Sequence, residues 1–156
     1  MKNFFKLMLL LLLAIPFQAC SDDDEAAIAN LEVTPYNIAG VWKLHNWSGS
    51  AESLPEVYIE FSRKENRFKI FQTYNSMYPE IKTGTYSVEK DYYKGTIMSG
   101  VYDYDNGKWN NKYVIKTFTD TVLELVAGKE TQTFVRVDKV PDYIINNIPE
   151  MEEVKN

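Results

Sequence analysis

The feature that most constrains this chain is a series of short alternating runs between residues 38 and 140. This stretch holds three Trp, nine Tyr and five Phe, with many Thr and Val, the residue types that suit half-buried pleated strands. None of it keeps the period of an amphipathic helix. Turn signals separate the runs, and Asn106-Gly107 is the strongest because both residues tolerate positive φ. The sequence therefore predicts an all-β domain.

Eight strands are predicted from these runs, at 41–47, 57–61, 67–74, 81–88, 93–102, 109–118, 121–127 and 130–137. Short connections without a helical crossover indicate an antiparallel sheet, whose exposed edges have to be hidden. An eight-stranded up-and-down barrel removes the edges, and hairpins between successive strands favour it over a β-sandwich. Residues 141–156 are expected to be a tail with a short helix, in which Tyr143, Ile144 and Ile148 pack on the barrel.

The N-terminus has the pattern of a secretion signal over residues 1–19. Two lysines precede the apolar stretch 7–15, which is about half of the roughly twenty residues that cross a bilayer. Residues 17–20, Phe-Gln-Ala-Cys, resemble the lipobox of bacterial lipoproteins, with a small residue before the cysteine. This resemblance implies that Cys20 receives diacylglycerol and palmitate and holds the mature chain on a membrane.

Residues 20–37 are predicted to be the lipidated cysteine and an acidic tether. Four acidic side chains follow Ser21 and repel one another, with no apolar neighbour between them. As a flexible coil, the tether would span roughly 20–25 Å. An acidic run directly after the cysteine resembles the surface-export signal of lipoproteins in the Bacteroidota. We therefore expect an outer-membrane protein displayed on the cell surface, and a plain spacer is the alternative.

Motifs within residues 38–140 resemble lipocalins. Gly40-Val41-Trp42 opens the first strand and Arg136 lies in the last, which is similar to the lipocalin pattern of a basic residue over a tryptophan. The resemblance implies that Arg136 and Trp42 form a cation–π pair that closes one end of the barrel, worth about 0.5–2 kcal/mol.

The order of further motifs is similar to that of lipocalin-like lipoproteins of the Bacteroidota. These motifs are Val57 to Phe61, Phe68 with Gln72, Gly84 with Tyr86, Ser99-Gly100 with Tyr102, and Trp109 with Tyr113. The segment from Tyr102 to Gly107 is longer than the family pattern. The resemblance implies an eight-stranded barrel over 38–140.

Five aromatic residues are candidates for ligand binding: Tyr74, Tyr86, Tyr102, Trp109 and Tyr113. In a cavity, their rings could stack on a small apolar, aromatic or sugar-like ligand, and their polar atoms could fix its orientation. The alternative is that they fill a solid barrel. A non-catalytic interaction module that contacts a partner protein or a glycan through its outer face or rim is the second function considered.

Enzymatic and metal-dependent classes find no support in the residues. His45 is the only histidine and Cys20 the only cysteine, so we expect no catalytic residues, no metal and no cofactor. After residue 20 the chain has 22 acidic and 15 basic residues, a formal charge of −7, which argues against nucleic acid. Asp103-x-Asp105 lacks the further ligands of a calcium loop. Asp120-Thr121-Val122 resembles the O-glycosylation sequence of the Bacteroidota, so Thr121 is a candidate acceptor of a glycan. We also expect the protein to be a monomer.

Overall fold

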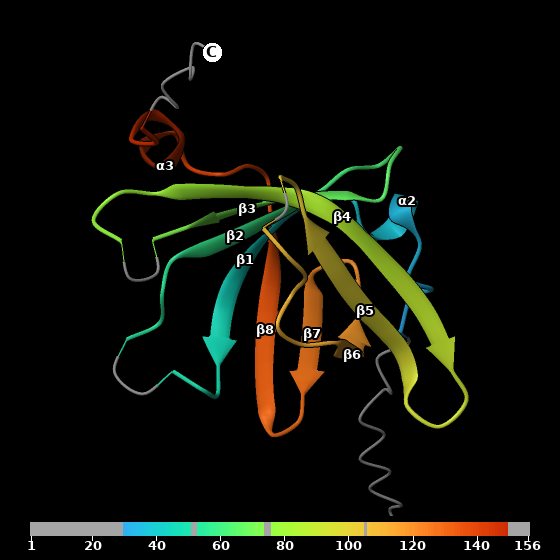
Figure 1. The fold of residues 1–156 in the computed structure, drawn as a ribbon. Coiled ribbons are helices and arrows are strands. Elements are labelled where there is room, and N and C mark those ends of the chain that lie inside the picture. Colours follow the sequence, from blue (N-terminus) through green and yellow to red (C-terminus); the bar gives the residue numbers. More distant parts are fainter. Residues whose placement is uncertain (1–29, 51–52, 74–75, 105, 150–156) are drawn as a thin grey trace, which may run out of the picture.

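The computed structural model describes residues 30–50, 53–73, 76–104 and 106–149, and their fold is a closed antiparallel barrel (Figure 1). Each strand pairs with the next along the chain, and β8 pairs with β1 to complete the ring. The strands are β1 Gly40–Trp47, β2 Val57–Phe61, β3 Arg67–Gln72, β4 Glu80–Asp91, β5 Gly95–Tyr102, β6 Tyr113–Phe118, β7 Val122–Ala127 and β8 Glu130–Val137. The predicted up-and-down barrel is confirmed, and the β-sandwich is excluded.

The barrel has two unlike ends. We call the mouth the end formed by the β1–β2, β3–β4, β5–β6 and β7–β8 connections, and the closed end the opposite one. The core lies inside the ring, because alternate residues of each strand point inward. Its largest fully buried members are Trp42, Phe61, Phe68, Phe118 and Phe134.

Two predicted strands differ from the observed ones in a way that matters for the site. The predicted run 109–118 begins too early, because β6 starts at Tyr113 and Trp109 lies in the β5–β6 loop. The loop folds back on β5, where the Trp109 backbone N–H donates to the Gly100 carbonyl at 2.9 Å. Strand β4 is longer than the predicted 81–88 at both ends.

The N-terminal segment is docked on the barrel from Asn30 onward, whereas the sequence predicts a tether up to residue 37. The backbone N–H of Leu31 donates to the Phe118 carbonyl at 2.7 Å. Helix α2, Pro35–Ile38, follows Thr34, whose hydroxyl accepts from the Asn37 N–H at 3.2 Å. The end of this segment is thus part of the folded domain, because it covers apolar core residues at the closed end.

Helix α3, Asp142–Asn146, packs on the outer face of the barrel. Ile144 is fully buried in a second apolar cluster with Tyr58, Phe71 and Val140, and Ile148 packs against it. Tyr143 differs from the prediction, since its side chain is 56% exposed.

Tyr143 instead donates a hydrogen bond to Glu56, which also accepts one from Tyr58 at 3.0 Å. Burial, followed by the bond to Glu56, raises the pKa of Tyr58 above its usual value. The tail is thus attached by an apolar contact and by a shared carboxylate.

Candidate functional site

The closed end is built around one guanidinium. Arg136 lies over the Trp42 ring, with its central carbon 4.1 Å from the ring centroid. Its Nε donates to the Asp120 carbonyl at 2.6 Å and its Nη2 to the Asn37 carbonyl at 2.8 Å. The Trp42 indole N–H donates to the Ile38 carbonyl at 2.8 Å. The pair therefore joins β1, β8, the β6–β7 turn and α2, which is a structural arrangement.

Gly40 leaves room for this arrangement. Its φ is +119°, and a Cβ at this position would lie 2.7 Å from Arg136 Nη1, closer than real side chains approach. The same Nη1 donates to the Ala39 carbonyl. Burial lowers the pKa of Arg136, but the group stays protonated at neutral pH because arginine starts so high. The Gly-x-Trp motif thus has a steric reason in this barrel.

Four of the five aromatic candidates belong to the apolar core inside the barrel or pack against it: Tyr86, Tyr102, Trp109 and Tyr113. Phe68 joins them: its ring centroid is 5.0 Å from that of Trp109 and 5.7 Å from that of Tyr102. Trp109 also meets Tyr113 edge to face, at 6.0 Å. Tyr86 contacts Phe61 at 5.1 Å. Tyr74 lies outside the described residues.

This aromatic cluster fills much of the interior. A Cβ on Gly100 would lie 2.3 Å from Trp109 Cε2, so the indole packs directly on the strand where only a glycine leaves space. Burial raises the pKa of Tyr86, and burial followed by the proximity of Tyr113 raises that of Tyr102. The alternative that the rings fill the barrel therefore accounts for Tyr86, Trp109 and Tyr113.

Two polar atoms in this cluster are buried without a hydrogen-bond partner in the described part of the chain. They are the Tyr86 hydroxyl and the Trp109 indole N–H, and Tyr86 as a whole is only 4% exposed. Buried donors are nearly always paired with protein, water or ligand. The Tyr86 hydroxyl and the Trp109 indole N–H are therefore polar groups inside the apolar interior that can bond to a water or a ligand.

A cavity opens beside this cluster, where the barrel wall is incomplete. Strand β4 begins four residues before its register with β5, which starts at Gly84 opposite Tyr102. Beyond it, a backbone hydrogen bond from the Asp103 N–H to the Thr83 carbonyl, 2.9 Å long, continues the contact. The first half of β4 therefore borders a gap toward the β5–β6 loop.

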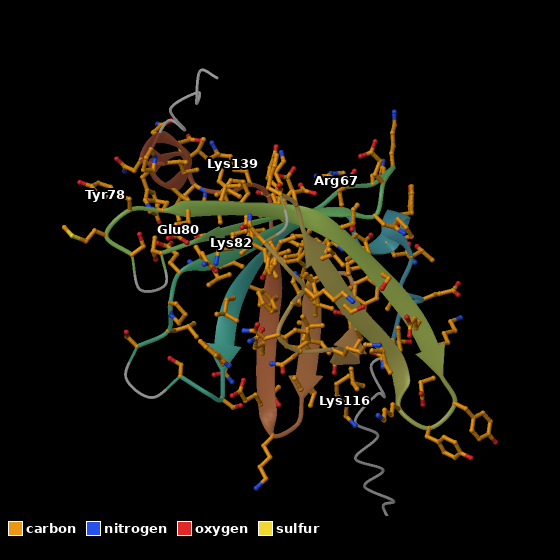
Figure 2. The ribbon with its side chains drawn as sticks, viewed as in Figure 1. Arg67, Tyr78, Glu80, Lys82, Lys116 and Lys139 are labelled. Carbon is orange, nitrogen blue, oxygen red and sulfur yellow. The ribbon has the colours of Figure 1, made fainter. Side chains whose placement is uncertain are left out.

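We call this gap the mouth cavity. Its volume is about 790 Å³, and its lining includes Tyr78, Glu80, Lys82, Tyr102 and Tyr104. Figure 2 shows Glu80 and Lys82 in the first half of β4 and Tyr78 in the connection that precedes it. The volume falls in the range of small-molecule sites, roughly 300–1,000 Å³. Tyrosine rings and charges of both signs meet here.

Lys82 and Glu80 point to the inner side of the sheet. Lys82 is opposite Ile70, a core residue, and Glu80 is opposite Gln72, and directly opposed residues share a face. Lys82 Nζ lies 4.0 Å from a Glu80 carboxylate oxygen, which accepts from the Gln72 amide at 3.5 Å. These long contacts leave both charged groups half-exposed and able to bind another partner.

Asp103 fixes the beginning of the loop that borders the cavity. Its carboxylate accepts from the Thr83 hydroxyl at 2.6 Å and from Arg67 of β3. The Thr83 bond, followed by the bond and charge of Arg67, lowers the pKa of Asp103. The adjacent Tyr104 has a φ of 59°, which is uncommon for a residue other than glycine. The exposed Tyr104 ring is thus presented by a defined turn.

Sequence reasoning found Tyr102 but missed most of the cavity lining. Glu80 and Lys82 continue the alternation of Gly84 and Tyr86. Lys82 already lies in the predicted strand 81–88, and extending that strand by one residue would have placed Glu80 on the same inner face. The Arg67 to Asp103 contact spans three strands and leaves no local signal.

A second cavity, of about 610 Å³, lies at the closed end beside the β2–β3 turn. Its lining is dominated by long charged side chains, among them Glu60, Arg63, Glu65, Arg67 and Lys69. It has none of the five aromatic candidates, and we regard the mouth cavity as the candidate site.

The remaining predicted residues lie elsewhere. His45 is exposed on β1 and Thr121 is exposed in the β6–β7 turn; neither lines the mouth cavity. Cys20 and Asp105 lie outside the described residues. Within the described ranges, no three His, Cys, Asp or Glu side chains gather as metal ligands, and no helix has the length and apolar character to span a bilayer.

A closed eight-stranded barrel with a guanidinium over a tryptophan at one end defines the class of up-and-down β-barrels. A family model described as a lipocalin-like domain matches residues 38–125. The chain belongs to this lipocalin-like domain family.

Solved structures with a similar fold come from Bacteroides species. A lipocalin-like protein from Bacteroides uniformis is 18% identical with a TM-score of 0.50, and the match covers 65% of this chain and 99% of that one. An uncharacterized protein from Bacteroides eggerthii is 16% identical with a TM-score of 0.49, over 64% and 98% of the two chains. No curated protein matches the sequence. At these identities, the likeness concerns the fold alone.

Proposed function

We propose that this protein is a lipid-anchored, surface-exposed lipoprotein of the outer membrane that binds a small sugar-like or aromatic ligand at its mouth. The observation that carries the binding proposal is the mouth cavity, where Tyr78, Tyr102 and Tyr104 stand beside Glu80 and Lys82. Ring faces stack on the flat or C–H-rich face of a ligand, and the charged groups bond to its hydroxyls.

A polar ring fits this site better than a purely apolar ligand. The deep interior is occupied by the packed rings of Phe68, Trp109 and Tyr113, which leaves the bordering mouth cavity as the space for a guest. That cavity carries an ammonium and carboxylates, and an apolar guest would have to desolvate these groups without pairing them. The ligand class is therefore a monosaccharide, a short glycan or a polar aromatic molecule.

Binding without catalysis is the expected mode of action. The only histidine, His45, is exposed on β1 and does not line the mouth cavity, and the Asp103 carboxylate beside the Thr83 hydroxyl is held by Arg67 as well. The fold family is a binding architecture.

The second candidate is an interaction module that binds a partner protein or glycan through its rim. It is favoured by exposed side chains at the mouth: Met77 is 93% exposed, Tyr104 86% and Tyr78 60%. Exposed apolar groups that gather at one site mark contact surfaces. The two candidate functions differ in the size of the bound molecule: a small ligand inside the mouth cavity, or a larger partner across the rim.

A fluorescence titration tests the small-molecule proposal, because Trp109 contacts the Phe68 ring that also touches Tyr102. The protein is titrated with a panel of monosaccharides, short glycans and polar aromatic molecules. We expect saturation by at least one of them, and Tyr102→Ala weakens its affinity about tenfold, the loss of about 1.4 kcal/mol from one stacking ring.

Tyr93→Ala is the matched control, because Tyr93 is an exposed tyrosine at the other end of the barrel. It should leave the affinity unchanged. An affinity that Tyr102→Ala leaves unchanged, or no saturation with any member of the panel, contradicts the proposal.

A further inference from the structure

The β4–β5 turn carries two almost fully exposed tyrosines. Tyr92 is 93% exposed and Tyr93 91%, and their rings meet edge to face with centroids 5.0 Å apart. The Asp91 carboxylate accepts hydrogen bonds from the backbone N–H groups of Tyr93 and Lys94, both at 2.8 Å. Gly95 follows with a φ of +85°. The sequence thus specifies a defined turn that holds two aromatic rings in solvent.

This turn lies at the side of the barrel where the chain enters. Lys90 forms a 2.9 Å ion pair with Glu32 of the N-terminal segment, and Asn30 accepts from the Phe118 N–H at the end of β6 at 2.8 Å. Nine residues separate Cys20 from Asn30. They reach at most about 35 Å when extended and about 17 Å as a coil, so an anchor at Cys20 keeps this side near the membrane.

The chemistry of the tip suits a lipid headgroup layer. Tyrosine is enriched at membrane interfaces, where its ring meets the acyl boundary and its hydroxyl stays wet. Lys94 lies next to the two rings, and a lysine close to a membrane surface is attracted to anionic headgroups, whereas Lys90 is held in its ion pair with Glu32. The chain after residue 20 carries a formal charge of −7, so an anionic surface repels the molecule as a whole.

We propose that the β4–β5 tip, defined as residues 90–95, lies in the headgroup layer of the membrane that holds the anchor. This inference rests on the proposed lipid attachment at Cys20. The β4–β5 turn lies at one end of β4, and the β3–β4 connection that borders the mouth cavity lies at the other end of that strand (Figure 1). The tip would therefore make a second contact with the bilayer and direct the mouth cavity away from it, toward incoming ligand.

Site-specific fluorescence quenching tests this orientation. Cys20 is the only cysteine, and its thiol is consumed by the lipid, so a cysteine introduced elsewhere can be labelled alone. Lys94→Cys places an environment-sensitive dye at the tip and leaves both tyrosines intact. Lys129→Cys is the matched control, since Lys129 is an exposed turn lysine at the mouth. Both lipidated proteins are reconstituted in vesicles of phosphatidylethanolamine and phosphatidylglycerol that contain headgroup nitroxide lipids.

We expect the nitroxide lipids to quench the dye at position 94 at least threefold more than the dye at position 129. Adding Tyr92→Ser and Tyr93→Ser to the Lys94→Cys protein should lower its quenching to the level of the control. Equal quenching at both positions, with the proteins still floating with the vesicles, overturns the orientation and leaves the anchor standing. A protein that does not float with the vesicles refutes the anchor, and the tip contact with it.

Discussion

Replacing Arg136 with methionine should destabilise the barrel strongly. Methionine keeps an unbranched chain of similar reach but removes the charge and the donors. Three hydrogen bonds to the carbonyls of Asp120, Ala39 and Asn37 are lost, at about 1 kcal/mol each. The contact with Trp42 is lost as well, at about 1 kcal/mol. Allowing about 1 kcal/mol for the added apolar packing of methionine, the expected loss is about 3 kcal/mol.

This loss is a large part of the stability of a typical domain, about 5–15 kcal/mol. It should lower the melting temperature by roughly 10–20 °C. Urea unfolding, followed by circular dichroism, measures the free energy directly. Arg136→Lys should recover little, because an ammonium cannot reproduce the planar fork of donors.

Arg63→Met is the matched control for this experiment. The Arg63 guanidinium also lies over an aromatic ring, 4.3 Å from the centroid of Tyr36, but that tyrosine is 66% exposed. An exposed pair of this kind is worth about 0.5–1 kcal/mol. If Arg136→Met costs no more than Arg63→Met, the closed end does not depend on the guanidinium and the reasoning fails.

Three further predictions concern other parts of the chain. Gly100→Ala should cost about 2–3 kcal/mol in urea unfolding, because its Cβ would overlap Trp109, while Gly95→Ala, with no atom near, should cost only about 1 kcal/mol of backbone strain; equal costs would contradict the packing argument. The low folded pKa of Asp103 means that its carboxylate stabilises the fold above about pH 4 and that this contribution is lost as the pH falls through the folded value. Asp103→Asn should therefore lower the free energy of unfolding at pH 7 and have progressively less effect in acid; an effect that grows in acid would reverse the sign. Cys20→Ala should move the protein from the membrane to the soluble fraction, and a variant that stays with membranes would show that Cys20 is not the anchor.

Most of the barrel follows from the sequence because its signals are local. Alternation of inward and outward residues marks each strand, and β2 and β8 begin and end where the pattern predicts. The Gly40 to Trp42 motif and Arg136 lie about 95 residues apart along the chain, yet they meet at neighbouring strands because β8 closes on β1. A closed barrel of sequential hairpins therefore predicts the pairing of β8 with β1.

The features that sequence reasoning missed depend on long-range fit. Tryptophan is a residue type that favours strands, but Trp109 lies in a loop. Its indole packs against Gly100 of β5. The mouth cavity exists because β4 extends beyond its pairing with β5. The point at which two strands stop pairing depends on their partners and is not marked by the residues of either strand. Asn30 and Leu31 are docked by bonds to β6 that no neighbouring residue signals.

The claim on which the function depends is that the mouth cavity holds a small molecule. Native mass spectrometry of the mature protein, purified from its own membranes, measures this directly. We predict a bound small molecule in addition to the anchor lipid, with its occupancy lowered in Tyr102→Ala and retained in Tyr93→Ala. A spectrum that shows only the lipidated chain, or the same bound molecule in both variants, would contradict the account.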